Sequence, residues 1–228
     1  FFVFPAFLIC ILPLSLLYYT NENFYSIDNL IDEDENFLIG YTYNESNYKY
    51  LKWKSILKKE RKDIWALGSS RVLQFREELF NQSFYNAGYT INTTGDYIPF
   101  LKSIPDEKLP DVLIIGFEHF MFNINWSISK KNKEESYWKE SFSYYPTVKM
   151  IWNIYTDLFS SIKFINENVK LEDTKYIGLN AHRNNVGFRN DGSMYYGGII
   201  KRLINKDTTL RQYKFKDVKT RIAKGNRK

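Results

Sequence analysis

The stretch "IWALGSSRVLQFREELF", residues 64–80, decides the fold. Its opening apolar run has charged residues before it and Gly68 after it, a pattern typical of a short buried strand covered on both faces. The residues that follow place Val72, Phe75 and Leu79 at helical spacing, with charged side chains between them. The stretch therefore predicts a strand, a tight turn and a helix.

Two further apolar segments extend this pattern along the chain. "QSFYNAGY" (82–89) predicts a second short strand, "TTGDYIPFLKSI" (93–104) a helix, and "LPDVLIIGFEHFMF" (109–122) the clearest strand. Strand and helix alternate at a spacing that favours right-handed crossovers, so the sequence predicts an α/β fold with a parallel sheet.

Small and polar residues follow each predicted strand. In open α/β sheets, ligands gather at the carboxyl ends of the strands. These ends are marked here by Gly68-Ser69-Ser70, Asn86-Ala87-Gly88 and Gly116-Phe117-Glu118-His119. The sequence therefore predicts a site where three strand ends meet.

Residues 1–19, "FFVFPAFLICILPLSLLYY", contain no charged side chain. The run is close to the roughly 20 residues needed to cross a bilayer, and we expect a membrane helix rather than a buried core helix. A cleaved signal peptide is the nearer alternative, but the exit "LLYYTNE" lacks the small residues of a cleavage site, which favours an uncleaved anchor. Between Tyr19 and Phe37 the only charged residues are acidic, so we expect the remaining chain on the extracytoplasmic side, in a bacterial periplasm or at the cell surface.

The rest of the chain is predicted to bury a sizeable core, because the 228 residues are 44% hydrophobic and 18% aromatic. We expect a lead-in segment at 20–61 and an α/β domain at 62–228. Within that domain, residues 126–170 form a predicted helical, aromatic insertion, and residues 171–200 hold five glycines and predict an ordered or lid-like loop region. The single cysteine, Cys10, lies in the predicted anchor, so the outer domain can form no disulfide.

The carboxyl-terminal residues 201–228 carry eleven Lys or Arg against two Asp, a local charge of +9 in a chain of net charge +6. Such a tail could bind nucleic acid, anionic lipid or an acidic glycan. A solvated helix face or a frayed end is the favoured alternative. No RNA-binding motif accompanies the tail, so we expect no nucleic-acid partner.

The serines of the first strand end allow two interpretations. Serine is a preferred N-cap residue, so Ser69 or Ser70 could simply cap the following helix. A serine nucleophile instead needs exposure, a base, and donors for the developing oxyanion. Ser70, at a strand-to-helix turn, would be exposed, and its own N–H would point free.

The three strand ends resemble the opening blocks of SGNH/GDSL-type esterases and acyltransferases. The resemblance covers about residues 62–122 and is closest to the membrane-anchored, cell-envelope branch, which includes proteins of teichoic acid D-alanylation and alginate O-acetylation. It implies a flavodoxin-like, three-layer parallel sheet. It also implies Ser70 as the nucleophile and the N–H groups of Ser70 and Gly88 as oxyanion donors. No His, Cys or Asp cluster in the sequence has the spacing of metal ligands, so we expect no metal site and no cofactor.

The third block departs from this family. Glu118 stands where the family has a donor asparagine, and an ionised carboxylate cannot donate, so either the site uses two donors or His119 takes a substitute role. The family's Asp-x-x-His does not occur in the 228 residues. We therefore expect the chain to be a fragment, incomplete at its carboxyl end. His182 is expected to be a loop histidine bonded to backbone, and Asp191-Gly192-Ser193 a turn.

Three functions follow from these patterns. The first is an extracytoplasmic O-acyltransferase or esterase that acts on a cell-envelope polysaccharide through an acyl-Ser70 intermediate, with the glycan or acyl donor and other proteins of a modification complex as partners. The second is a non-catalytic glycan-binding or assembly component. The third, ranked last, is membrane-surface scaffolding through the basic tail.

Overall fold

The computed structural model describes residues 3–23, 25–33, 35–123, 147–160 and 171–197. The chain divides into two compact units, Phe1–Tyr195 and Tyr196–Lys228, and the account below concerns the first. The basic tail and most of the predicted insertion lie outside the described residues.

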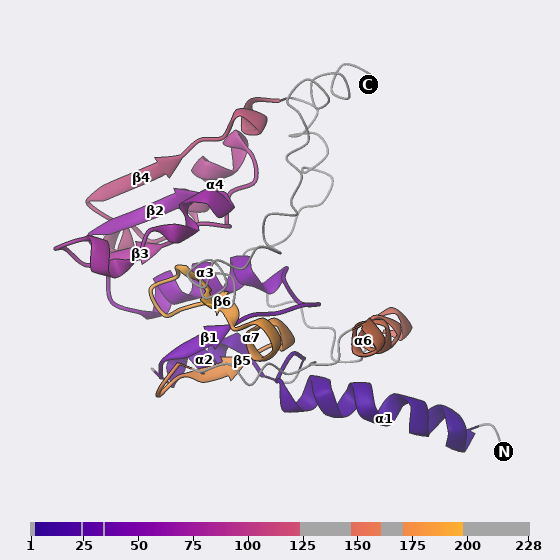
Figure 1. Cartoon of the computed structure of the whole chain (residues 1–228). Helices are drawn as coiled ribbons and strands as arrows, with labels where there is room; N and C mark the ends of the chain where they lie inside the picture. The colour runs from indigo at the N-terminus through magenta and orange to yellow at the C-terminus, as the bar shows by residue number, and fades with distance from the viewer. Residues whose placement is uncertain (1–2, 24, 34, 124–146, 161–170, 198–228) are drawn as a thin grey trace, which may run out of the picture. The chain divides into compact units, whose positions relative to one another are not determined.

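The first sheet is parallel, with the strand order β3-β2-β4 (Figure 1). In register, Ile64 pairs with Phe84 and Val112, and at the other end Gly68 pairs with Gly116. The predicted α/β arrangement of three parallel strands is thereby confirmed. The strands span Ile64–Gly68 (β2), Phe84–Asn86 (β3) and Val112–Gly116 (β4).

Helices cover one face of this sheet. Ile56 of α3 (Asn47–Lys58) and Phe100 of α4 (Tyr97–Lys102) are buried in one cluster with Trp65 of β2. The apolar side chains of β2 that point the other way pack against residues of the 70–80 segment, with Val72 buried among them.

The prediction of a helix directly after β2 is wrong. Residues Ser70–Gln74 and Glu77–Leu79 form two short 3-10 turns, η1 and η2. Val72 is buried, as its spacing predicts, but Phe75 is 37% exposed and Leu79 is 64% exposed. Because only the first turn of the apolar stripe meets the sheet, tertiary packing does not support a continuous helix.

β4 is less covered than its sequence suggests. β2 is buried along its whole length, whereas Val112 is 51% exposed and Ile115 is 42% exposed. Each of these side chains leaves part of its surface open, so the described residues do not cover β4 fully.

A second sheet was not predicted from the sequence. Its order is β5-β1-β6-β7, with β1 parallel to β5 and antiparallel to β6. The segment predicted as a lead-in therefore contributes a strand, and the segment predicted as a loop region contributes three strands and a helix. The elements are α2 (Ile27–Asp32), β1 (Phe37–Ile39), β5 (Lys175–Ile177), α7 (Leu179–Asn184), β6 (Val186–Phe188) and β7 (Met194–Tyr196).

Gly178 allows the backbone directly after β5 to approach the backbone directly after β1 closely. Gly178 has φ +88°, and a Cβ atom there would lie 2.2 Å from the carbonyl oxygen of Gly40. A side chain would therefore strain the backbone and separate the two segments. This explains one of the glycines that the sequence pattern assigns to a loop.

α1 (Val3–Tyr19) confirms that the first residues are helical. Near its end, Leu17 is buried with Ile154 of α6 (Val148–Ser160) and with Leu179. Ile154 lies in the segment predicted as a helical, aromatic insertion, and its side chain faces the core. Across the ranges that the structure describes, no helix combines the length and the apolar character needed to cross a membrane.

A buried carboxylate follows α1. Glu22 accepts hydrogen bonds from the backbone N–H groups of Thr42 (2.8 Å), Tyr43 (2.6 Å) and Leu179 (2.7 Å), and a longer one from Asn44 (3.3 Å). Burial raises the pKa of Glu22 to about 7, and the four N–H groups oppose that rise. Glu22 thus ties the end of α1 to the segment after β1 and to the start of α7.

Candidate functional site

Ser70 lies at the predicted place, on the turn that follows the central strand β2. The Ser69 hydroxyl accepts from the N–H of Arg71 at 3.4 Å, so Ser69 is the N-cap of η1. Ser70 is exposed and is the first residue of the turn, where its N–H has no acceptor within the turn. Among the described residues, no hydrogen bond engages the Ser70 hydroxyl. Ser69 is therefore the residue that caps η1, and Ser70 is the exposed serine that remains a candidate nucleophile.

The three strand ends surround one side chain, Val72. A Cβ atom at Gly88 would lie 2.5 Å from Val72 Cγ2, and one at Gly116 would lie 2.3 Å from Val72 Cγ1. At Gly68 the corresponding distance to Cγ1 is 3.2 Å. The glycines that end the strands therefore have a packing role, since they make room for the valine that anchors the Ser70 turn to the sheet.

Asn86 holds the same turn from the side of β3. Its side chain is fully buried, and its Nδ2 donates to the carbonyl oxygens of Val72 (2.7 Å) and Phe75 (2.9 Å). These are carbonyl groups that a continuous helix would use, which is a second reason for the 3-10 geometry. Asn86 Oδ1 in turn accepts from the N–H of Gly88 at 2.9 Å. The N–H that the family resemblance implies as an oxyanion donor therefore already has an acceptor.

Glu118 brings an ion pair to this edge. It lies two residues after β4, it is 6% exposed, and its Oε2 lies 2.8 Å from Arg71 Nε. Glu118 Oε1 is also buried and has no hydrogen-bond partner within the described part of the chain. Nearby, the Tyr97 hydroxyl donates to the Gly116 carbonyl at 2.9 Å. Burial raises the pKa of Tyr97, and the negative charge of Glu118 raises it further.

The Arg71–Glu118 pair is the feature of this edge that sequence reasoning missed. In the sequence, Glu118 stands where the family resemblance implies a donor asparagine, and Arg71 directly follows the candidate nucleophile Ser70. Neither position alone predicts the pairing. It depends on the register of β2 and β4, which sets the loops after both strands side by side.

His119 lies at the start of η5 (His119–Phe122), the turn after β4. Its ring is exposed and contacts Phe120, with ring centroids 5.8 Å apart. No hydrogen bond joins His119 to Ser70 among the described residues. The structure thus places His119 at the carboxyl end of β4 without making it part of a formed Ser–His pair.

The structural roles predicted for His182 and for Asp191-Gly192-Ser193, a backbone contact and a turn, are confirmed. His182 Nε2 lies 3.1 Å from the carbonyl oxygen of Tyr176, although His182 sits in α7 rather than in a loop. Asp191 Oδ1 accepts from the Ser193 N–H (2.9 Å) and from the Ser193 hydroxyl (2.7 Å). Gly192 between them has φ +78°, as a tight turn requires.

A buried amine connects that turn to the candidate site. Lys52 of α3 is fully buried, and its Nζ donates to the carbonyl oxygens of Asn86 (2.8 Å) and Gly192. The ring of Phe188 lies 4.2 Å from Nζ. Burial lowers the pKa of Lys52 well below its ordinary value, and the charge of Asp191 opposes this shift. Lys52 thus reaches, through Asn86, the turn that carries Ser70.

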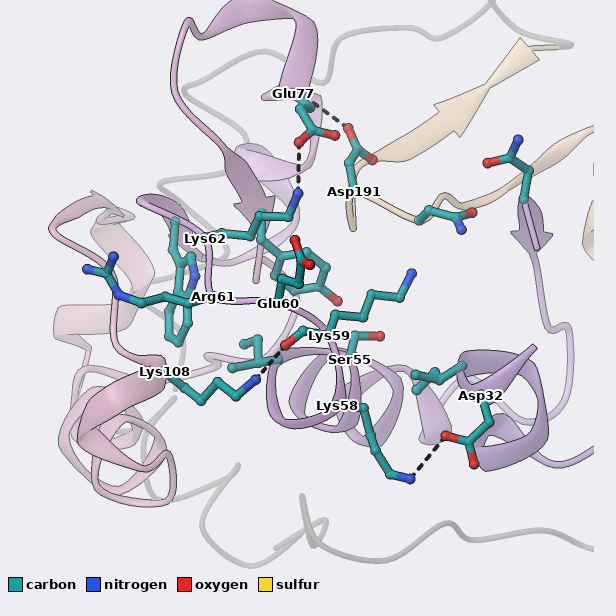
Figure 2. Close-up of a pocket in the computed structure, with 16 residues that line it drawn as sticks. Asp32, Ser55, Lys58, Lys59, Glu60, Arg61, Lys62, Glu77, Lys108 and Asp191 are labelled. Carbon is teal, nitrogen blue, oxygen red and sulfur yellow. Dashed lines mark hydrogen bonds and ion pairs between the residues drawn. The ribbon is translucent and has the colours of Figure 1, made fainter. Parts of the chain in front are cut away.

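A cleft of about 640 Å³ lies near the amino end of β2 and does not include Ser70 (Figure 2). Lys58 pairs with Asp32 and Lys62 pairs with Glu77, both at 3.0 Å. The remaining charged lining residues are Lys59, Glu60, Arg61, Lys108 and Asp191. Five cations thus face four carboxylates, and the side chains of Asn36, Ser55 and Asn190 add neutral polar groups.

Within the described ranges, no group of three or more His, Cys, Asp or Glu side chains is arranged to hold a metal ion. Comparisons of the chain with profiles of protein families, with curated proteins and with solved structures gave no match.

Proposed function

We propose that the chain is an extracytoplasmic, serine-dependent O-acyltransferase or esterase that acts on a cell-envelope polysaccharide, on a flavodoxin-like fold of the SGNH type anchored through residues 1–19. One observation carries the proposal. Ser70, an exposed residue, stands on a tight turn at the carboxyl end of the central parallel strand, where open α/β sheets bind ligands.

The chemistry needs few groups. Ser70 Oγ attacks the carbonyl carbon of an acyl ester while a base takes the hydroxyl proton, and the donor alcohol leaves with a proton. Water or a glycan hydroxyl then attacks the acyl-Ser70 ester, which regenerates the serine. His119 is the candidate base within the described residues, and it begins η5 at the carboxyl end of the neighbouring strand β4.

Labelling with a fluorophosphonate tests this proposal. Full-length folded protein is expected to take up one phosphonyl group, and peptide mass spectrometry is expected to place it on Ser70. Ser70→Ala should abolish the labelling. Ser69→Ala is the matched control, because it removes the neighbouring hydroxyl that caps η1 and leaves Ser70 in place.

The opposite result is equally clear. If the folded full-length protein stays unlabelled, or if the label falls on another serine, the acyl-Ser70 mechanism is excluded.

Glycan binding without catalysis is the second candidate. The observation that favours it is the bond between the Gly88 N–H and Asn86, which removes one expected oxyanion donor, together with a separate polar cleft. It predicts that an acidic oligosaccharide binds equally well to the wild type and to Ser70→Ala, with no ester turnover. Lys62→Glu, in the cleft, should weaken that binding, whereas Lys102→Glu on α4, outside the cleft lining, should not.

A further inference from the structure

The geometry points to Arg71, held by Glu118, as the group that binds the oxyanion formed during attack by Ser70. This inference rests on the proposed function and adds a catalytic residue to it, with Glu118 as the positioning residue. It follows from a shortage of donors at the strand ends and from the way in which the guanidinium is held.

The donors available from the backbone are few. Acyl transfer develops negative charge on the carbonyl oxygen, and hydrogen-bond donors fixed around that oxygen supply much of the catalysis. The N–H of Ser70 begins η1 and has no acceptor in that turn. The N–H of Gly88 is bonded to Asn86 Oδ1 at 2.9 Å. Of the two N–H groups implied as oxyanion donors, one thus has no acceptor within its own turn and the other is engaged.

The loop after β4 supplies an acceptor instead of a donor. Glu118 is 6% exposed and forms an ion pair with Arg71. An ionised carboxylate offers no proton to an oxyanion and would repel it. Glu118 can assist the reaction only through the cation that it holds.

Arg71 is held in a manner that suits this role. Its Nε lies 2.8 Å from Glu118 Oε2, yet the Arg71 side chain is 72% exposed while that of Glu118 is 5% exposed. One nitrogen of the planar guanidinium is therefore fixed to a buried anchor, and the other two, with four N–H donors, extend from the residue next to Ser70. Among the described residues these N–H groups have no acceptor, and such a cation, carried by the residue next to Ser70 in the chain, is what a developing oxyanion needs.

Fluorophosphonate labelling measures this interaction directly. Ser70 Oγ forms a bond to phosphorus, fluoride leaves with the P–F electron pair, the hydroxyl proton passes to a base, and charge builds on the phosphoryl oxygen as it does on a carbonyl. Arg71→Gln is expected to slow the labelling of Ser70 by about 10²- to 10³-fold, the usual effect of losing one oxyanion donor. Arg76→Gln is the matched control, since Arg76 is a nearby arginine that faces Glu78 at 4.0 Å, and it should label at the wild-type rate.

Variants at Glu118 separate positioning from simple folding. Arg71→Gln leaves the buried carboxylate of Glu118 without its cation. The double variant Arg71→Gln/Glu118→Gln removes that carboxylate as well, and each new amide can donate a hydrogen bond. We expect the double variant to label faster than Arg71→Gln alone. Glu118→Asp, which keeps a carboxylate for Arg71, should retain more of the rate than Glu118→Ala.

The outcomes are distinguishable. Labelling of Ser70 in the wild type at the same rate as in a folded Arg71→Gln protein overturns the role of Arg71 and leaves the proposed function standing. No labelling of the folded wild type overturns the proposed function, and this inference with it.

Discussion

Val72 and the glycines around it set the shape of the candidate site. A Cβ atom at Gly88 would lie 2.5 Å from Val72 Cγ2 and 2.8 Å from Asn86 Oδ1, distances that real Cβ atoms do not adopt. Gly88→Ala is therefore expected to lower the free energy of unfolding by about 1–3 kcal/mol through overpacking. Chemical denaturation measures the change.

The control for this prediction lies within the same segment of the chain. A Cβ atom at Gly95 has its nearest neighbour 3.7 Å away, so Gly95→Ala should change stability little. Gly88→Ala and Val72→Ala together should cost less stability than the sum of the two single substitutions, because Val72→Ala removes the closest clash. A Gly88→Ala protein as stable as the wild type would contradict the packing role of this glycine.

Glu22 gives a prediction about pH. Its pKa is raised to about 7 by burial, above the ordinary value of 4.5. An acid of this kind binds more protons in the folded than in the unfolded state between the two values, so its contribution to stability falls as pH rises from about 4.5 to about 7. The free energy of unfolding of the wild type, relative to Glu22→Gln, should fall by up to about 3 kcal/mol over that interval. Denaturation at a series of pH values tests this.

Glu172→Gln serves as the comparison, because Glu172 is exposed. Glu172→Gln retains Glu22, so its free energy of unfolding should fall over this pH interval as that of the wild type does. A constant difference between the wild type and Glu22→Gln would count against a raised Glu22 pKa.

Among the secondary-structure elements, the strands of the parallel sheet were predictable and the helix after β2 was not. The apolar run 64–67, which ends at Gly68, predicts a buried strand, and β2 forms at this position. Residues 72–79 have helical spacing, but the side chain of Asn86 takes the carbonyl groups of Val72 and Phe75. A buried amide from a neighbouring strand overrode the local pattern, and no local pattern could reveal it.

Lys52 links α3 to the ends of both sheets and predicts a pH effect of the opposite sign to that of Glu22. Burial lowers its pKa well below the ordinary value of 10.5. The folded state then binds fewer protons than the unfolded state between the lowered pKa and 10.5, so stability rises with pH in that interval. Relative to Lys52→Met, the wild type should become more stable as the pH is raised toward 10, which denaturation at several alkaline pH values can follow.

Lys54 on the same helix is the matched control. Its pKa is raised, chiefly by its hydrogen bond to Asp28, so its contribution to stability cannot increase over this pH interval. Lys54→Met should therefore show no gain of the wild type with rising pH. If the two methionine variants behave alike, the amine of Lys52 is not buried in solution.

For the chain as a whole, long-range pairing limited what the sequence could predict. β1 at 37–39 pairs with β5 at 175–177 and with β6, and each of these strands has three residues. Strands so short carry no clear period-two pattern, and partners separated by more than 130 positions cannot be matched from local spacing. The position of Ser70 was predictable because Ser70 directly follows a strand in the sequence. The Arg71–Glu118 pair and the contacts of the buried Lys52 join segments that are far apart in the sequence, so local spacing could not predict them.

Membrane association of the whole chain is the last prediction. We expect the wild type to remain with the membrane fraction after carbonate extraction, because residues 1–19 are uncharged and predominantly apolar. Ile11 and Leu12 are 41% and 46% exposed within the first compact unit, whereas Leu17 is buried against Ile154. Ile11→Lys/Leu12→Lys should therefore release the protein from the membrane without removing the contact that Leu17 makes, since each lysine near the centre of a membrane helix costs about 2.5–3.5 kcal/mol.

The matched control places lysines on a different helix. Val148 and Trp152 of α6 are 84% and 73% exposed, so Val148→Lys/Trp152→Lys adds the same charge at exposed apolar positions outside α1. This variant should stay with the membrane fraction if residues 1–19 are the anchor. Release of both variants would indicate that exposed apolar surface, rather than α1, holds the chain at the membrane, and a wild type that carbonate extracts completely would refute the anchor.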